Sequence, residues 1–252
     1  MFGLLRAWKR RRLARRPFPA TWLPHIEQHV AFYVFLPPQL RERFLELLKI
    51  FVWEKHFIGA GGMEITDEVK VVISAAAVRM VLKLDLGYFD RLTEIVVYPG
   101  SYRHQGDAQG VILGEAQSWG TVVLSWEAVL HGLQHHSDGH DTATHEFAHV
   151  LDRGGGSFDG TPLLRALEDY RPWAEVMTHH FNRLRSGARR ERKVLRDYGA
   201  TDEAEFFAVA TEAFFEKPEQ MHEQTPELYE LLRRFYGCDP LARRRERREQ
   251  AT

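Results

Sequence analysis

The stretch DTATHEFAHVLDRGGG, from Asp141 to Gly156, contains the pattern His-Glu-x-x-His at His145, Glu146 and His149. Two histidines at this spacing, with a glutamate after the first, are typical of a metal site with a general base. The chain has 13 histidines, and its composition gives roughly 0.06 chance matches to the pattern. A coincidence is therefore a poor explanation, but the chemistry requires that the stretch be helical.

The residues around the pattern predict that helix. Its apolar positions are Ala143, Phe147, Ala148, Val150 and Leu151. Asp141 is a suitable N-cap, and the glycines at 154–156 end the segment. His145 and His149 are one turn apart, so both imidazoles can reach a single cation. Glu146 is rotated by about 100° from His145 and can hold a water molecule instead of the metal.

A catalytic metal of this type commonly has three protein ligands, so a third ligand must come from elsewhere. Metzincins place glycine and histidine three and six residues after the second histidine, but this chain has aspartate and glycine there. A glutamate on a later helix is the other common arrangement, and residues 201–217 are the best candidate. Glu205 and Glu212 lie on one face of that segment, and the spacing does not choose between them. The alternative is that Glu205, Glu212 and Glu216 form a solvated stripe.

Apolar periodicity and the positions of glycine and proline divide the rest of the chain into helices and short strands. We expect helices at 37–57, 67–84, 141–153, 161–184, 201–217 and 225–237, and strands at 94–99, 110–117 and 121–126. Helices thus come first, then a few strands, then helices again. This order predicts an α+β fold that is mostly helical, with a small central mixed or antiparallel sheet.

Composition excludes several classes of protein. The net charge of −1 gives no overall field that would attract nucleic acid. Cys238 is the only cysteine, so an internal disulfide is impossible, which fits a reducing compartment. No apolar region of a signal peptide follows the basic N-terminus, and no stretch approaches the ~18 apolar residues of a membrane span. We therefore expect a cytoplasmic protein.

Both ends of the chain are basic. Residues 1–16 contain seven basic and no acidic side chains. We expect a flexible basic arm at 1–20, a single domain at 21–240 and a basic tail at 241–252. The alternative for residues 1–16 is an amphipathic helix that contacts an anionic membrane surface or nucleic acid.

Several segments together resemble a known family. THEFAHVLD, from Thr144, is followed by DYGATDEAEFFAVATEAFF, from Asp197. Upstream, the segments GAGGMEITDEVKVVISAAAVRMVLKL, EIVVYPGSY and GEAQSWGTVVLSW occur in the same order. The chain thereby resembles, over about residues 35–240, the Mlc titration factor A family of bacterial zinc peptidases, also called the DgsA anti-repressor family. The metal core of that family is similar to the catalytic domain of anthrax lethal factor, which implies a zincin-like, gluzincin-type domain at 21–240.

The resemblance also implies a set of site residues. The ligands of one Zn²⁺ per chain would be His145, His149 and Glu205. Glu146 would be the general base that takes a proton from a zinc-bound water during hydrolysis of a peptide bond. Tyr198, seven residues before Glu205, would donate its hydroxyl proton to the developing oxyanion. Glu212 would then lie outside the ligand set.

Two functions follow from the resemblance. The first is a zinc-dependent, aminopeptidase-like peptidase with a peptide substrate. The family is also associated with binding Mlc, the transcriptional repressor of glucose phosphotransferase genes. The alternative is therefore a regulatory protein that sequesters a repressor of the Mlc type, with zinc mainly structural.

Three further expectations concern the surroundings of the site. We expect residues 120–129 to form an edge strand to which a peptide adds by β-augmentation, a mode excluded if this strand is paired on both sides. Asp152 lies seven residues after His145 and is expected to orient an imidazole. We expect a surface or loop cluster for four other histidines: His131, His135, His136 and His140.

Overall fold

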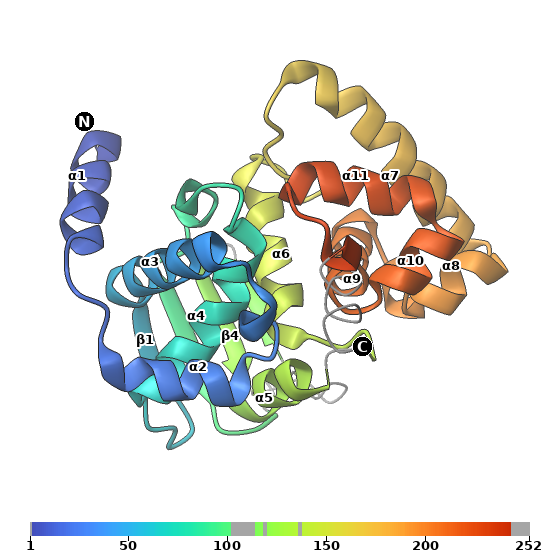
Figure 1. Cartoon of the computed structure of the whole chain (residues 1–252). Helices are drawn as coiled ribbons and strands as arrows, with labels where there is room; N and C mark the ends of the chain where they lie inside the picture. Colours follow the sequence, from blue (N-terminus) through green and yellow to red (C-terminus); the bar gives the residue numbers. More distant parts are fainter. Residues whose placement is uncertain (1, 102–113, 118–119, 136–137, 243–252) are drawn as a thin grey trace.

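A computed structural model describes residues 2–101, 114–117, 120–135 and 138–242 (Figure 1). Its α-helices are α1 (Phe2–Ala14), α2 (Leu23–His29), α3 (Pro38–Glu54), α4 (Asp67–Val81), α5 (Trp126–Gln134), α6 (Thr142–Gly154), α7 (Tyr170–Arg185), α8 (Arg189–Val194), α9 (Glu203–Glu216), α10 (Pro218–Gln224) and α11 (Pro226–Tyr236). Its strands are β1 (His56–Gly59), β2 (Glu94–Tyr98), β3 (Gly114–Gln117) and β4 (Thr121–Ser125). Short 3₁₀ helices lie at Ala20–Trp22 (η1), Tyr33–Phe35 (η2), Leu86–Phe89 (η3), Leu167–Asp169 (η4) and Asp197–Ala200 (η5). The predicted mostly helical α+β fold is confirmed.

The strands form one mixed sheet in the order β1-β2-β4-β3. β1 and β4 both run parallel to β2, and β3 runs antiparallel to β4. β4 therefore has a neighbour on each side, and the expectation that residues 120–129 form an edge strand is wrong. The strand β1 was missed because its four residues directly continue the helical pattern of α3.

Helix boundaries differ from the prediction where tertiary contacts outweigh the local preference of the sequence for a helix start. The helix expected from residue 161 begins only at Tyr170, whose hydroxyl accepts a hydrogen bond from the Leu164 N–H at 3.2 Å. Tyr88 donates a hydrogen bond to the carbonyl of Leu163 at 2.8 Å. These two tyrosines hold residues 163 and 164 in a segment without regular secondary structure, although Thr161 and Pro162 are a common helix start.

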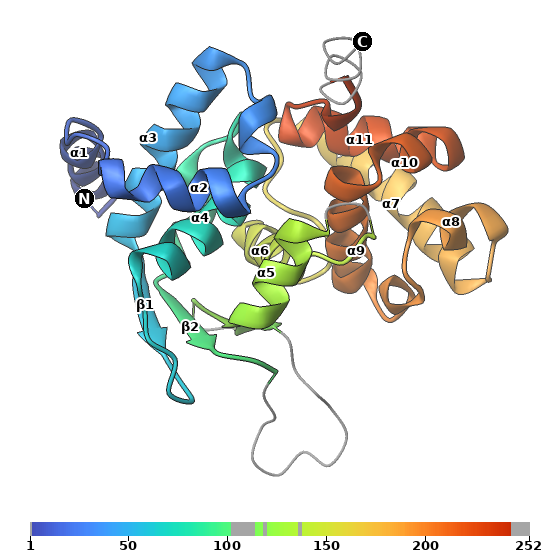
Figure 2. The same ribbon diagram turned by 60° about the horizontal axis from the view of Figure 1, so that its bottom comes forward.

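Two aromatic groups anchor α6 and α9 from opposite sides. Phe51, Phe89 and Phe147 contact one another edge to face, with ring centroids 5.5 to 6.1 Å apart, and join α3 and η3 to α6. The second group joins α7, α9 and α11 through Trp173, Phe207 and Phe235. Figures 1 and 2 show α6 between the sheet-containing half and the C-terminal helices, where it packs against α9.

The N-terminal residues differ from the expected flexible arm. Residues 2–14 form α1, which packs on α3. Arg10 donates hydrogen bonds to Glu54 at 2.9 Å and to Asp90 at 2.7 Å. These carboxylates lie far from Arg10 in sequence, so no local sequence pattern predicts the contact. The division at residues 20 and 240 stays a prediction, and residues 243–252 of the expected tail lie outside the described residues.

None of the helices in the described ranges combines the length and the apolar composition that crossing a membrane requires.

Candidate metal centre

The helix α6 begins as predicted. The Asp141 carboxylate accepts hydrogen bonds from the Thr144 N–H at 2.9 Å and from the Thr144 hydroxyl at 2.6 Å. His145 and His149 project from the same face of the buried helix, and their Nε2 atoms lie 3.2 Å apart. Two imidazole nitrogens thus point at one small volume.

A carboxylate from α9 enters the same volume. Glu205 Oε2 lies 3.0 Å from His145 Nε2 and 3.5 Å from His149 Nε2. One potential ligand atom from each of the three residues lies within 4.8 Å of the others. Asp202, rather than the threonine before it, caps α9 by accepting a hydrogen bond from the Glu205 N–H at 2.9 Å. The cap and the ligand are therefore parts of one helix start.

Glu212 lies on the other side of the same imidazole. Its Oε1 is 2.7 Å from His145 Nδ1, its Oε2 accepts a hydrogen bond from the Asp141 N–H at 2.8 Å, and it forms an ion pair with Arg196. Because His145 Nδ1 is bound to this carboxylate, its Nε2 is directed at Glu205. The two glutamates that spacing left equivalent thus have different positions.

Two residues near the imidazoles do not match the sequence analysis. Asp152 accepts a hydrogen bond from the Gly160 N–H at 3.0 Å, and within the described ranges no hydrogen bond joins it to His145 or His149. Arg196 was not predicted, because nothing in its local sequence distinguishes it from other surface arginines. Glu212, held by Arg196, makes the contact to an imidazole that we expected of Asp152.

The carboxylates around the three-residue group favour a positive charge at this point, as a cation would supply. Burial lowers the pKa of His145, but the carboxylates of Glu205 and Glu212 outweigh burial and raise it to about 10. The two imidazoles hold the pKa of Glu205 well below its usual range, although burial acts to raise it. Glu205 Oε2 is buried and, among the described residues, has no partner in hydrogen-bond geometry. The group therefore combines an ionised carboxylate with two convergent ring nitrogens, a common donor set for a metal ion.

Tyr198 and Glu146 flank this group. The Tyr198 hydroxyl donates a hydrogen bond to Glu205 Oε1 at 3.2 Å, and its ring centroid is 5.9 Å from that of His145. Burial and the nearby carboxylates raise the pKa of Tyr198 to about 12, so its hydroxyl keeps its proton at neutral pH. Glu146 is buried on α6 beside His145. All five predicted site residues therefore lie around one point.

A further aromatic side chain lies against the site. The Phe158 ring centroid is 5.1 Å from that of His149, and the residue is 46% exposed. The glycine-rich loop that contains Phe158 carries no sequence signal for this contact.

The other histidines that the structure describes do not join the site. The rings of His131 and His135 stack on each other with centroids 4.3 Å apart. Within the described part of the chain, His145, His149 and Glu205 are the only group of histidine, cysteine or acidic residues with converging ligand atoms. His136 lies outside the described residues.

The fold and this donor group define a class: a mostly helical α+β protein with a metal-binding site of the metallopeptidase type. The chain belongs to the glucose-regulated metallo-peptidase M90 family, whose model matches residues 5–237. This confirms the resemblance to the Mlc titration factor A family. The match begins near the start of the chain, so α1 belongs to the matched segment, which extends beyond the expected range.

Relatives support the same assignment. The chain is 35% identical over 246 residues to the uncharacterized protein slr2042 of Synechocystis sp., covering 93% of this chain and 90% of the relative. It is 30% identical over 222 residues to Mlc titration factor A of Pectobacterium atrosepticum, covering 82% and 83%. It is also 30% identical over 217 residues to Mlc titration factor A of Serratia proteamaculans, covering 81% and 82%.

Proposed function

We propose that this protein is a zinc-dependent peptidase. The observation that carries the proposal is the convergence of His145 Nε2, His149 Nε2 and Glu205 Oε2 at separations of 3.0 to 3.5 Å. Two imidazoles and one carboxylate are the ligands of many catalytic zinc sites, which keep a fourth position open. Zinc bound there supplies a Lewis acid for the peptide carbonyl and lowers the pKa of a water molecule.

The chain's own residues would handle the protons. Glu146 follows a proposed ligand directly, and its buried carboxylate lies close enough to His145 and Tyr198 to raise the pKa of both, which suits a general base that passes a proton to the leaving amine. Tyr198 stays protonated and already donates to Glu205 at 3.2 Å, so a small rotation would direct its hydroxyl at a developing oxyanion.

An extended peptide would add to β3 rather than to β4. Among the strands that the structure describes, β3 is an outer one, and it lies against α6, which carries the proposed ligands. Backbone hydrogen bonds from an edge strand align a peptide without regard to its sequence. We propose an aminopeptidase-like action on such a peptide, and comparing free with N-acetylated peptides tests this part separately.

The test of the proposal separates metal binding from turnover. Glu205→Gln is expected to lose most of its zinc, measured by elemental analysis after dialysis. Glu146→Gln is expected to keep one zinc per chain while its peptide turnover falls by about 10²- to 10⁴-fold, the usual effect of losing a general base. The control is Glu203→Gln, an exposed residue on the same helix, which should match the wild type in both measurements.

Two outcomes would contradict the proposal. A full equivalent of zinc in Glu205→Gln would refute the ligand assignment. Undiminished turnover in Glu146→Gln would refute the role of the general base.

The names of two relatives favour a second function, the binding of a transcriptional repressor of the Mlc type. The two functions are not mutually exclusive. If the chain sequesters a repressor without cleaving it, Glu146→Gln should bind purified Mlc as tightly as the wild type in a pull-down assay. Failure of both proteins to retain Mlc would reject this second function.

A further inference from the structure

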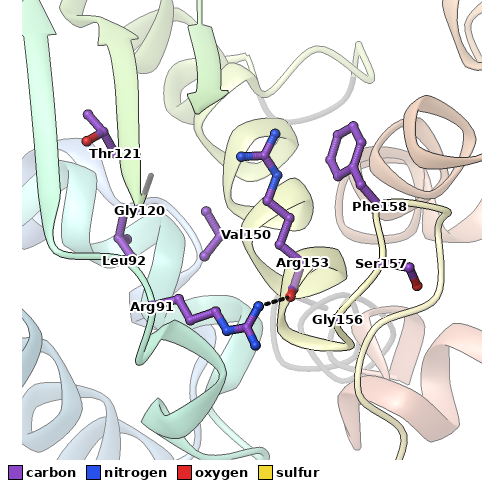
Figure 3. Close-up of a pocket in the computed structure, with 9 residues that line it drawn as sticks. All are labelled: Arg91, Leu92, Gly120, Thr121, Val150, Arg153, Gly156, Ser157 and Phe158. Carbon is purple, nitrogen blue, oxygen red and sulfur yellow. Dashed lines mark hydrogen bonds between the residues drawn. The ribbon is translucent and has the colours of Figure 1, made fainter. Parts of the chain in front are cut away.

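A pocket of about 320 Å³ lies next to the candidate metal centre (Figure 3). Val150 and Arg153 of α6 line it, together with Phe158 from the following loop. Arg153 comes four residues after His149, one helical turn further along the same face. Phe158 also contacts the His149 imidazole, so its ring belongs to both the pocket and the metal centre.

The pocket carries positive charge. Arg91 and Arg153 both line it, and no acidic side chain is among its lining residues in the described part of the chain. Arg91 donates a hydrogen bond to the carbonyl of Arg153 at 3.2 Å. The Arg153 guanidinium lies over the Phe158 ring, 4.6 Å from its centroid, while its Nη1 is buried without a hydrogen-bond partner among the described residues.

Such an arrangement is unfavourable unless an anion completes it, because a buried charged donor without an acceptor loses its hydration without compensation. Several other partly buried arginines that the structure describes have oxygen acceptors, which are carboxylates or, for Arg41, backbone carbonyls. Arg10 binds Glu54, and Arg183 binds Glu191 at 2.7 Å. Among the residues that the structure describes, the Arg153 guanidinium contacts only the Phe158 ring, so the acceptor that it lacks is expected to come from a ligand.

The residues that line the pocket indicate which kind of anion it would bind. Leu92, Val150 and Phe158 provide apolar walls that suit methylene groups, and the guanidinium groups suit a planar carboxylate at their end. Thr121, which also lines the pocket, is paired with Gln117 at the end of the edge strand β3. A peptide that lies along β3 would therefore bring one of its residues to this pocket.

We propose that this pocket is a subsite for a carboxylate group of the peptide substrate. The proposal rests on the peptidase function proposed above. The carboxylate comes either from an aspartate or glutamate side chain or from the free C-terminus of the peptide. A protonated α-amino group would be repelled by the two arginines, so this pocket does not bind the N-terminus of a substrate.

Matched internally quenched peptides test the proposal and distinguish the two sources. One set carries Glu, Gln or Lys at each position around the cleaved bond in turn, and a second set has a free or an amidated C-terminus. The zinc-loaded wild type should cleave the Glu peptide about 10-fold faster in kcat/KM than the Gln peptide at one position, and the Lys peptide most slowly. If the preference is for the free C-terminus instead, the C-terminal carboxylate is the ligand.

Arginine variants connect the preference to the pocket. Arg153→Gln should reduce the Glu-to-Gln ratio, or the acid-to-amide ratio, to about one. Arg153→Lys should retain part of it, because lysine keeps the charge but not the forked donor geometry. The control is Arg171→Gln, an exposed residue of α7 whose ion pair is with Glu175, and it should leave the ratio unchanged.

A binding measurement keeps this proposal separate from the peptidase function. Fluorescein-labelled copies of the same peptides are titrated with zinc-loaded Glu146→Gln protein, and anisotropy is recorded. Carboxylate peptides should bind more tightly than their neutral counterparts, and Arg153→Gln should abolish this difference. That result supports the subsite even if the wild type cleaves nothing. Absence of cleavage rejects only the peptidase function. Equal cleavage and equal binding of Glu and Gln peptides and of free and amidated ends would overturn the subsite while leaving the peptidase function intact.

Discussion

Glu212 shows how a single buried side chain can determine the geometry of the proposed metal site. It touches His145, Asp141 and Arg196 at once, and thereby connects α9 to the start of α6. A carboxylate behind a metal-binding imidazole orients the ring and raises its basicity. The residue is therefore expected to affect metal binding without touching the metal.

We predict that Glu212→Gln weakens zinc binding by about 10- to 100-fold, the usual effect of losing such a partner. The amide keeps the shape of the side chain but removes the charge that holds His145 and Arg196. A zinc titration against a competing chelator measures the change, with Glu203→Gln as the control. Unchanged affinity in Glu212→Gln would show that this carboxylate has only a structural role.

Lys55 is a second buried charge, far from the metal centre in sequence. Its ammonium donates hydrogen bonds to the carbonyls of Phe89 and Leu92, both at 2.7 Å. Burial lowers the pKa of Lys55 from 10.5 to about 8, a shift that the nearby Glu54 partly opposes. Between these two values the unfolded chain binds more protons than the folded protein, so folding stability from this residue rises with pH.

We therefore predict that the contribution of Lys55 to the free energy of unfolding increases by about 3 kcal/mol as the pH rises from below 8 to above 10.5. Urea denaturation at pH 7.5 and pH 10 captures most of this change, roughly 2 kcal/mol, as the difference between wild type and Lys55→Met. Lys193→Met, at an exposed position, is the control and should follow the wild type at both pH values. A pH-independent difference between wild type and Lys55→Met would contradict the shift.

At the scale of elements, α5 and α6 approach closely because of one glycine. A β-carbon added at Gly132 would lie 2.9 Å from the Asp141 Cα and 3.1 Å from the His140 carbonyl oxygen. Both of these are backbone atoms, which cannot move aside cheaply. A glycine inside a helix normally weakens it, but Gly132 makes room here for the N-cap of α6.

This contact predicts the sign of a substitution. Helix propensity alone would make Gly132→Ala stabilising by up to ~1 kcal/mol. We expect instead a loss of roughly 1–3 kcal/mol, because the new methyl group overpacks the junction between the two helices. Thermal denaturation distinguishes the signs, with Gly3→Ala in α1 as the control, since nothing lies within 4 Å of that position. A stabilised Gly132→Ala would contradict the close approach.

At the scale of the whole molecule, α1 is tied to the body by ion pairs rather than by a continuous apolar face. Leu13 is buried, whereas Leu4 and Trp8 are 80% and 62% exposed. Arg10 contacts carboxylates from two separate segments, Glu54 at the end of α3 and Asp90 after η3. The basic composition that suggested a flexible arm is thus partly used within the fold.

We predict that Arg10→Ala lowers the free energy of unfolding by roughly 1–3 kcal/mol, the usual range for charged hydrogen bonds that are partly buried. Arg11→Ala changes an exposed neighbour and should alter stability by less than about 0.5 kcal/mol. Urea denaturation of both variants measures the difference. Equal stability of the two variants would mean that α1 is not anchored through Arg10.

Features formed by interactions within one segment could be predicted from the sequence, whereas features formed by distant segments could not. The periodicity around His145 predicted α6 because the apolar residues, the Asp141 cap and the glycines all act within one segment. The strand β1 was missed because four residues after a helix carry too little periodicity. The edge strand was assigned wrongly because strand order depends on pairing between distant segments, which a local pattern does not contain.

By itself, the sequence determined the mostly helical character of the fold, the paired imidazoles on one face of α6 and the candidate glutamates on one face of α9, because these follow from spacing along a helix. Only the tertiary structure decided which glutamate faces the imidazole Nε2 atoms and which lies behind His145. It also placed Arg153 and Phe158 around a pocket that no sequence motif predicted. The physical reason is that ligand geometry and electrostatics depend on which side chains the packing of α6, α9 and the sheet brings within a few ångströms of one another.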